Sequence, residues 1–147
     1  MKKQFKLIII SAALFVLCLN ISPVQSQESL YKRLGGYDAI AAVSDEFVSR
    51  LASEPQLKKF TAGLSTDSQK KLRQHLVDFI CNATGGPCLY LGRDMTTAHT
   101  GLHITKDEWN IGAGLLVETL DKFKVPAKEK EELLGAVSSL ESQIVGK

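Results

Sequence analysis

The sequence has 147 residues, of which 44% are hydrophobic and 23% are charged, and its formal net charge at pH 7 is +2. A chain of this size forms one domain with one modest core. So small a net charge indicates neither a nucleic-acid-binding protein nor a protein of anionic membrane surfaces.

The first 26 residues have the layout of a secretory signal peptide. Three lysines precede an apolar run from Leu7 to Leu19, and short residues surround the bond after Ser26. The run has 13 residues, whereas a membrane-spanning helix needs roughly 20. We expect cleavage after Ser26, a mature domain of residues 27–147, and export to a bacterial periplasm. The alternative is a membrane anchor formed by an uncleaved signal segment.

Cleavage would change the charge and the cysteine content. The mature chain would keep 15 of the 18 basic residues and all 16 acidic ones, a net charge of −1. Cys81 and Cys88 would remain. An oxidising compartment permits a disulfide between them, but the sequence does not show whether their Cα atoms come close enough.

The mature chain is predicted to be helical throughout, because no stretch alternates in the manner of a strand. After a short N-terminal turn, Gly35 and Gly36 interrupt the chain. A first long helix follows, ends at Glu54-Pro55, and precedes a short segment that carries Leu57 and Phe60. Its apolar residues recur at helical spacing: Ile40, Val43, Phe47 and Leu51.

A second long helix is predicted to begin at Thr66, where Thr66 and Gln69 have the spacing of a capping box. His75 lies about 60° from Leu72, at the edge of the apolar stripe of this helix. Gly85-Gly86-Pro87 ends the helix. The stripe consists of Leu72, Leu76, Phe79, Ile80 and Ala83.

The region from Cys88 to Thr105 reads as a loop, interrupted by a short helical turn over residues 95–99. A second capping box, Thr105 with Glu108, opens the next helix. Val125-Pro126 separates it from a last helix. The inward residues of that last helix are expected to be Leu133, Leu134, Val137, Leu140 and Ile144.

Histidines are the chemistry-bearing residues that stand out. The sequence contains three, His75, His99 and His103, and it has neither a hydrolase nor a nucleotide-binding motif. His99 and His103 have a spacing that could bind a metal on a helix, but Gly101 between them argues against a continuous helix. These observations alone define a small exported helical domain.

From Leu30 to about Val145 the chain resembles the group I truncated haemoglobins. Four stretches carry the resemblance in order and spacing: LYKRLGGYDAI (residues 30–40), the helix around Phe47, GGP followed by YLG (85–92), and RDMTTAHTGLHIT (93–105). The resemblance implies an all-α fold, a two-over-two helical sandwich around haem b. It places the proximal iron ligand on His99, within the A-H-x-G segment.

The resemblance also suggests the surroundings of the haem. Phe79, Met95 and Trp109 fall where large apolar side chains could line its slot, and core packing is the alternative for each. Tyr90 and Arg93 could bind the propionates, and ordinary surface roles are the alternative. To bind iron, His99 must present a neutral imidazole nitrogen. Its other ring nitrogen is then expected to be hydrogen-bonded to a carbonyl or to water.

The distal side departs from the family pattern. Some members carry there a histidine or lysine that binds iron, and we expect this of His75; the alternative is a histidine that faces a propionate or solvent. Members that hold oxygen tightly place tyrosine just after the position of Phe47 and polar groups on the distal helix. Here these positions are apolar, which argues against tight oxygen storage. They are Val48, Leu72 and Leu76.

Some members attach haem to a histidine of the last helix, and residues 126–147 contain none, so the haem is expected to be non-covalent. His103 matches no ligand position and is interpreted as a surface or propionate-side residue. We expect a monomer that binds oxygen, nitric oxide or another small haem ligand. The alternatives are a haem enzyme (nitric oxide dioxygenase, peroxidase or nitrite reductase-like) with a reductase partner, a bis-histidyl electron carrier, and a helical interaction module without haem.

Overall fold

The computed structural model describes residues 28–147, and these residues form helices and loops without a strand. The expected all-α fold is therefore confirmed. The signal peptide and its cleavage site lie outside the described residues. In chain order the elements are α2 (Leu30–Arg33), α3 (Gly36–Ser53), the 3-10 helix η2 (Lys58–Phe60), α4 (Thr66–Ala83), α5 (Met95–His99), α6 (Lys106–Lys122), α7 (Ala127–Ser138) and α8 (Glu141–Ile144).

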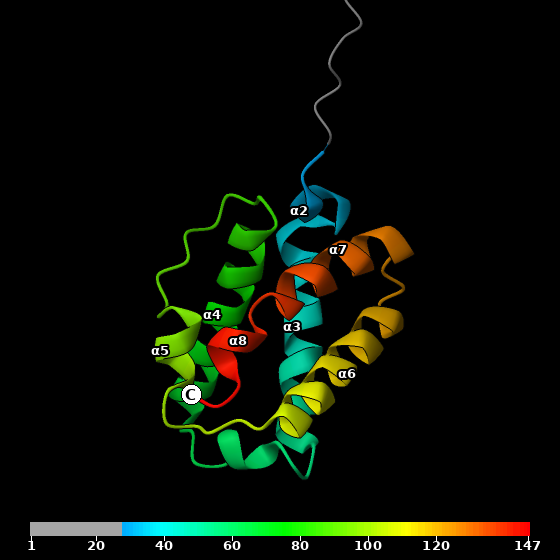
Figure 1. Cartoon of the computed structure of the whole chain (residues 1–147). Coiled ribbons are helices and arrows are strands. Elements are labelled where there is room, and N and C mark those ends of the chain that lie inside the picture. Colours follow the sequence, from blue (N-terminus) through cyan, green and yellow to red (C-terminus); the bar gives the residue numbers. More distant parts are fainter. Residues whose placement is uncertain (1–27) are drawn as a thin grey trace, which may run out of the picture.

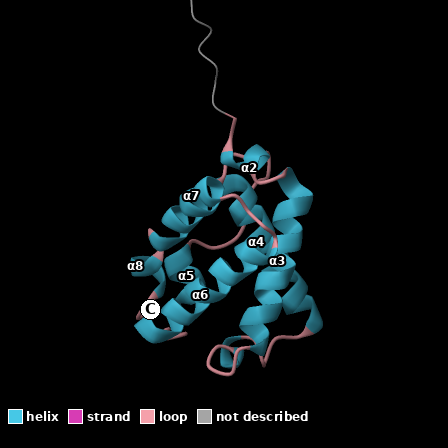
Figure 2. Cartoon of the chain, turned by 90° about the vertical axis from the view of Figure 1, so that its right-hand side faces the viewer, coloured by secondary structure: helices cyan, strands magenta, loops and turns pink. Residues whose placement is uncertain are grey.

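Helix α3 lies between α4 and α6 in the view of Figure 1 and contacts both. Helix α7 follows α6 and returns to contact α2, so the last long helix closes the core on its other side. Figure 2 shows the same helices from the side. The shared core consists of Ile40, Val43, Val77, Ile80, Cys81, Leu116, Leu120 and Leu133.

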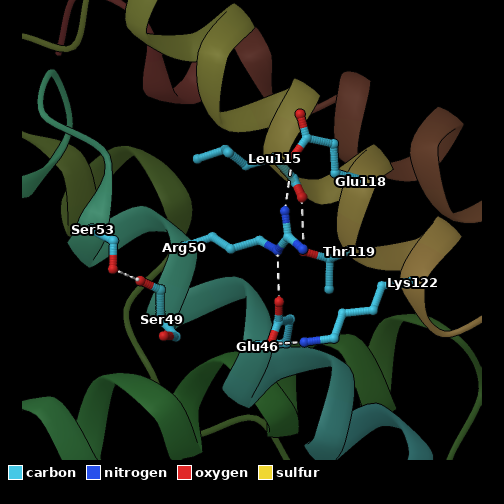
Figure 3. Close-up of polar contacts among 8 residues, drawn as sticks. All are labelled: Glu46, Ser49, Arg50, Ser53, Leu115, Glu118, Thr119 and Lys122. Atoms are coloured by element: carbon cyan, nitrogen blue, oxygen red, sulfur yellow. Dashed lines mark hydrogen bonds and ion pairs between the residues drawn. The ribbon is translucent and has the colours of Figure 1, made fainter.

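Charged side chains join α3 to α6 at the rim of this core (Figure 3). The guanidinium of Arg50 lies 2.8 Å from Glu46 and 2.7 Å from Glu118, and the Nζ of Lys122 lies 2.7 Å from the other oxygen of Glu46. The hydrogen bonds from Lys122 and then Arg50 hold the pKa of Glu46 below its ordinary value. The two helices are therefore joined by a network of charges rather than by one isolated pair.

One predicted capping box is confirmed and the other is wrong. Thr105 caps α6 and the side chain of Glu108 returns to the Thr105 amide, as expected. Helix α4, however, is capped by Ser65, whose hydroxyl accepts from the amide of Ser68 at 3.2 Å. The side chain of Gln69 instead donates to the carbonyl of Leu64. Serine is the better N-cap of the two, and Ser65 is the residue that stays extended before the helix.

The core face of α4 also differs from the predicted stripe. Val77 and Cys81 are fully buried, and Ile80 and Thr84 are buried beside them. Ile80 belongs both to the predicted stripe and to this buried face. Leu72, also in the predicted stripe, is 40% exposed. At about 100° per residue, Leu72, Leu76 and Phe79 centre on a direction far from the core face. Helix α4 therefore has two apolar faces. Leu76 and Phe79 of the second face pack against the core cluster but remain half-buried, so the core covers this face only in part.

The last helix is shorter than predicted. It breaks after Ser138, and α8 begins at Glu141 with Leu140 before it. Ile144 of α8 is buried as expected. No helix within residues 28–147 is long and apolar enough to cross a membrane.

Candidate functional site

The site begins with α5, a helix of five residues that carries His99 at its C-terminal end. Asp94 caps its first turn, because one carboxylate oxygen accepts from the amide of Thr97 at 2.9 Å and the other accepts from the Thr97 hydroxyl at 2.6 Å. The hydroxyl bond and then the amide bond hold the pKa of Asp94 below its ordinary value. So short a helix has little stability of its own, and the cap fixes where it begins.

His99 is oriented by its own helix. Its Nδ1 lies 2.7 Å from the carbonyl oxygen of Met95, one turn earlier. A carbonyl can only accept, so Nδ1 carries the proton and the lone pair of Nε2 is free. The side chain is half-buried. This is the arrangement that metal-binding histidines adopt, with one nitrogen bonded to the protein and the other available to a metal.

The C-terminal segment packs against α5. Helices α5 and α8 contact each other, and they lie side by side in both views (Figures 1 and 2). Beyond α8, the amide of Gly146 donates to the carbonyl of Ile104 at 2.9 Å, and the amide of His103 donates to the carbonyl of Lys147 at 2.8 Å. These two bonds fix the chain that follows His99.

The uncovered face of α4 supplies the second part of the site. Leu72, His75, Leu76 and Phe79 share this face, which is centred roughly 140° around the helix from the core face. Leu76 and Phe79 are half-buried, whereas Leu72 and His75 are exposed. An apolar helix face that the protein leaves partly uncovered is a surface that a flat apolar group can cover.

The loop from α4 to α5 returns alongside α4 (Figure 1). Its Tyr90 lies against that face, in contact with Phe79 and His75. The ring of Tyr90 is edge-on to Phe79, with centroids 5.2 Å apart, and edge-on to His75 at 6.2 Å. Its hydroxyl donates to the carbonyl of Arg93 at 2.6 Å. Burial, and then the charge of Asp94, raise the pKa of this hydroxyl.

One disulfide and two hydrogen bonds hold the start of this loop. Cys81 and Cys88 form a disulfide with their Cα atoms 5.7 Å apart, which resolves the alternative that the sequence left open. The side-chain amide of Asn82 donates to the carbonyl of Cys88, and the amide of Gly86 donates to the carbonyl of Cys81. The loop is therefore fastened to the C-terminal end of α4.

The residues of the site fit a haem group better than a metal bound by side chains alone. Within residues 28–147, no group of three or more histidine, cysteine, aspartate or glutamate side chains could hold a metal ion. His99 offers one oriented imidazole nitrogen, and a porphyrin supplies the other ligands that iron needs. The uncovered apolar face of α4 suits the ring of such a cofactor.

Comparisons with known proteins agree with this fit. The family model of bacterial-like globins matches residues 29–145. The group 1 truncated haemoglobin GlbN of Mycolicibacterium paratuberculosis is 34% identical over 116 residues, which cover 79% of this chain and 83% of that protein. The chain belongs to the group I truncated haemoglobins. Haem b is the cofactor of this family, so the expected family, fold and cofactor are confirmed.

Solved structures show the same fold. The truncated haemoglobin of Tetrahymena pyriformis in its Fe(III) form superposes with a TM-score of 0.75 at 25% identity, covering 82% of this chain and 100% of that one. The 2/2 haemoglobin of Synechococcus, in the cyanomet state and with covalently attached haem, gives a TM-score of 0.73 at 25% identity, covering the same shares of the two chains. This truncated globin therefore has the two-over-two architecture.

The other predicted site residues occupy varied places. Phe47 packs against the core cluster. Val48, Met95 and Trp109 are half-buried, which leaves both a haem contact and core packing open to them. Arg93 and His103 are exposed, and His103 has a left-handed φ of 50°.

Sequence reasoning missed two residues of the site. Asp94 was not predicted as a cap, although an aspartate three residues before Thr97 and just before a helical turn is a recognisable signal. Gly92 belongs to the YLG stretch that carries the resemblance, but no role was predicted for it; a methyl group there would overlap the phenol of Tyr90. Its role depends on the position of the Tyr90 ring, which no local pattern predicts.

Proposed function

We propose that this truncated globin binds haem b non-covalently, with His99 as the proximal iron ligand and His75 as the distal one, and that it binds oxygen or nitric oxide reversibly. One observation carries the proposal: the Nδ1 of His99 is bonded to the Met95 carbonyl, which leaves Nε2 free for a metal. Haem, when bound, supplies the iron and the site of gas binding. The protein supplies everything else.

On the proximal side the protein orients one imidazole. The Asp94 cap fixes the first turn of α5, and the bonds of Ile104 and His103 to the C-terminal segment fix the chain beyond His99. A ligand held at both ends of its segment needs little reorganisation when it binds a metal, because its orientation is already set.

On the distal side the only polar side chain among Leu72, His75, Leu76 and Phe79 is His75. A bound gas would therefore find one hydrogen-bond donor on this face of α4. If His75 itself binds the iron, it must move aside before a gas enters, and the apparent affinity falls with the fraction of open protein. The same absence of other donors favours a second candidate function, a bis-histidyl electron carrier.

The absence of a histidine from residues 126–147 supports non-covalent haem, in contrast to the covalently attached haem of the Synechococcus protein. Turnover of nitric oxide, peroxide or nitrite with a reductase partner is the enzymatic alternative. Turnover that requires an added reductase would favour it, whereas rapid gas exchange without turnover favours a gas-binding protein.

The deciding experiment compares optical spectra of the ferric and ferrous protein with those of His75→Ala, His99→Ala and His103→Ala. We expect a low-spin ferrous spectrum that becomes five-coordinate in His75→Ala, and severe loss of haem in His99→Ala. His103→Ala is the matched control and should resemble the wild type. A high-spin wild type would contradict the distal role of His75, and an unchanged spectrum in His99→Ala would contradict the whole assignment.

We also propose export with cleavage after Ser26. The proposal rests on the sequence pattern of residues 1–26. Mass spectrometry of the protein from a periplasmic extract should find a chain that begins at Gln27. A full-length chain in the membrane fraction would instead support the retained anchor.

A further inference from the structure

Tyr90 stands where the loop between α4 and α5 meets the uncovered face of α4. Its ring is edge-on to His75 at 6.2 Å between centroids, with an angle of 81° between the ring planes. It is also edge-on to Phe79, at 5.2 Å and 74°. Both arrangements lie in the range that aromatic pairs prefer. Because His75 and Phe79 are one helical turn apart, a single ring contacts two successive side chains of this face.

The hydroxyl end of the Tyr90 ring is also closely fitted. A methyl group added at Gly92 would overlap the phenol ring of Tyr90. The hydroxyl at the far end of the ring donates to the carbonyl of Arg93 at 2.6 Å. The ring therefore has little freedom to turn or slide, and its place requires glycine at position 92.

The segment that carries Tyr90 is itself fastened to α4. Two residues before Tyr90, Cys88 is joined to Cys81 by the disulfide, and its carbonyl accepts from the side chain of Asn82 at 3.1 Å. Cys81 is fully buried in the core. Tyr90 is thus connected through a short, tied segment to the same helix that carries His75.

We propose that Tyr90 is a positioning residue that holds the imidazole of His75 on the uncovered face of α4. This inference rests on the proposed distal role of His75. His75 is exposed, so its side chain is otherwise free to turn into solvent. The Tyr90 ring favours the conformation on the α4 face, and it thereby lowers the fraction of protein that is open to a gas ligand.

The physical effect is a shift between two populations. An aromatic pair of this kind changes such an equilibrium roughly twofold to tenfold. The observed rate of carbon monoxide binding follows the open fraction, so removal of the ring increases that rate by the same factor. The low-spin share of the ferrous spectrum falls correspondingly.

Three variants test the Tyr90 ring, its hydroxyl and its position against Gly92. Tyr90→Leu removes the ring, Tyr90→Phe keeps the ring and removes only the bond to Arg93, and Gly92→Ala displaces the ring without changing it. Leu91→Ala is the control for the loop, because Leu91 is 79% exposed. Gly114→Ala is the control for the glycine change, because a methyl group there meets no atom within 4 Å.

In the haem-loaded protein, Tyr90→Leu and Gly92→Ala should raise the rate of carbon monoxide binding and lower the low-spin ferrous share. Leu91→Ala and Gly114→Ala should stay near the wild type. Tyr90→Phe should lie between the wild type and Tyr90→Leu, because it keeps the ring and loses only the hydroxyl bond. In the haem-free protein, nuclear magnetic resonance should show a ring-current shift of the His75 ring protons that both Tyr90→Leu and Gly92→Ala abolish. With three histidines in the chain, His75→Ala assigns those signals.

The outcomes separate this inference from the proposed function. If His75→Ala changes the ferrous spectrum but Tyr90→Leu and Gly92→Ala leave the spectrum and the binding rate unchanged, the positioning role of Tyr90 is wrong and the distal role of His75 stands. If His75→Ala changes nothing, the distal role itself is wrong. A wild-type His75 without a ring-current shift contradicts the packing on which the inference depends.

Discussion

The Nδ1 of His99 lies 2.7 Å from the carbonyl oxygen of Met95, and this contact gives a histidine on a short helix a fixed orientation. The carbonyl selects the tautomer, because it can only accept a hydrogen bond, so Nδ1 must carry the hydrogen. It also limits rotation of the ring, so that Nε2 points in one direction. A backbone group within the same five-residue helix thus fixes the orientation that the proposed binding of iron by His99 requires.

The cap of α5 should influence haem retention. In Asp94→Ala the amide and hydroxyl of Thr97 lose their acceptor, so α5 should fray and His99 should lose its fixed position. We expect haem transfer to an excess of a competing haem acceptor to be roughly twofold to tenfold faster. Asp94→Asn, which keeps one acceptor oxygen, is the matched control. Equal transfer rates in Asp94→Ala and the wild type would show that the cap is irrelevant to the site.

The same carboxylate predicts an acid dependence. The pKa of Asp94 is lowered in the folded chain, relative to an unfolded value of about 3.9. Its contribution to stability is therefore complete above roughly pH 5 and is lost as the pH falls through the lowered pKa. The ratio of the haem-transfer rates of wild type and Asp94→Asn should rise below about pH 4, since the asparagine does not titrate. A ratio that stays constant with pH would contradict this role.

The disulfide should contribute to global stability. It closes a loop with a sequence separation of 7 residues, for which chain entropy predicts a loss of about 2–3 kcal/mol when the bond is removed. Urea unfolding of the haem-free double variant Cys81→Ser, Cys88→Ser should show this loss. Adding a dithiol reductant should destabilise the wild type and leave the double variant unaffected. A reductant effect of equal size on both proteins would mean that it does not act through this bond.

Gly86 should tolerate no side chain. A Cβ there would lie 2.5 Å from the ring of Tyr31 and 2.7 Å from the carbonyl oxygen of Cys81. Gly86→Ala should therefore cost about 1–3 kcal/mol of unfolding free energy, as overpacking does elsewhere. Gly114→Ala in α6, with open space around it, should instead stabilise the protein by about 0.5–1 kcal/mol. Urea denaturation measures both, and similar effects in the two variants would rule out the steric explanation.

A polar side chain at position 48, where other family members carry tyrosine, should strengthen oxygen binding. In a His75→Ala background, Val48→Tyr adds a hydroxyl near the position of the usual family tyrosine, and a hydrogen bond to the gas should slow oxygen dissociation roughly threefold to tenfold. Val48→Phe has the same ring without the hydroxyl and is the control. Stopped-flow dissociation measures the effect. If the two variants release oxygen equally fast, Val48 does not face the bound gas.

Much of the fold followed from local patterns in the sequence. The apolar spacing of α3, the capping box of Thr105 and Glu108, and the short turn that ends at His99 are all signals within a few residues, and the structure agrees with each. Family resemblance then identified the haem fold, because the four stretches that carry it are specific when taken together in their order and spacing. Such features depend on hydrogen bonds and side chains that are neighbours along the chain.

Other features were decided only by tertiary structure. The sequence alone left open the Cys81–Cys88 bond and did not separate the two apolar faces of α4, since both contain leucine, isoleucine or phenylalanine at helical spacing. Packing against α3 selected Val77 and Ile80 for the core and left Leu72, Leu76 and Phe79 partly uncovered. The position of the Tyr90 ring between Gly92 and His75 likewise depends on the loop after α4, which runs back alongside α4. Periodicity shows which residues share a helix face, but only the positions of the other helices determine which face the protein covers.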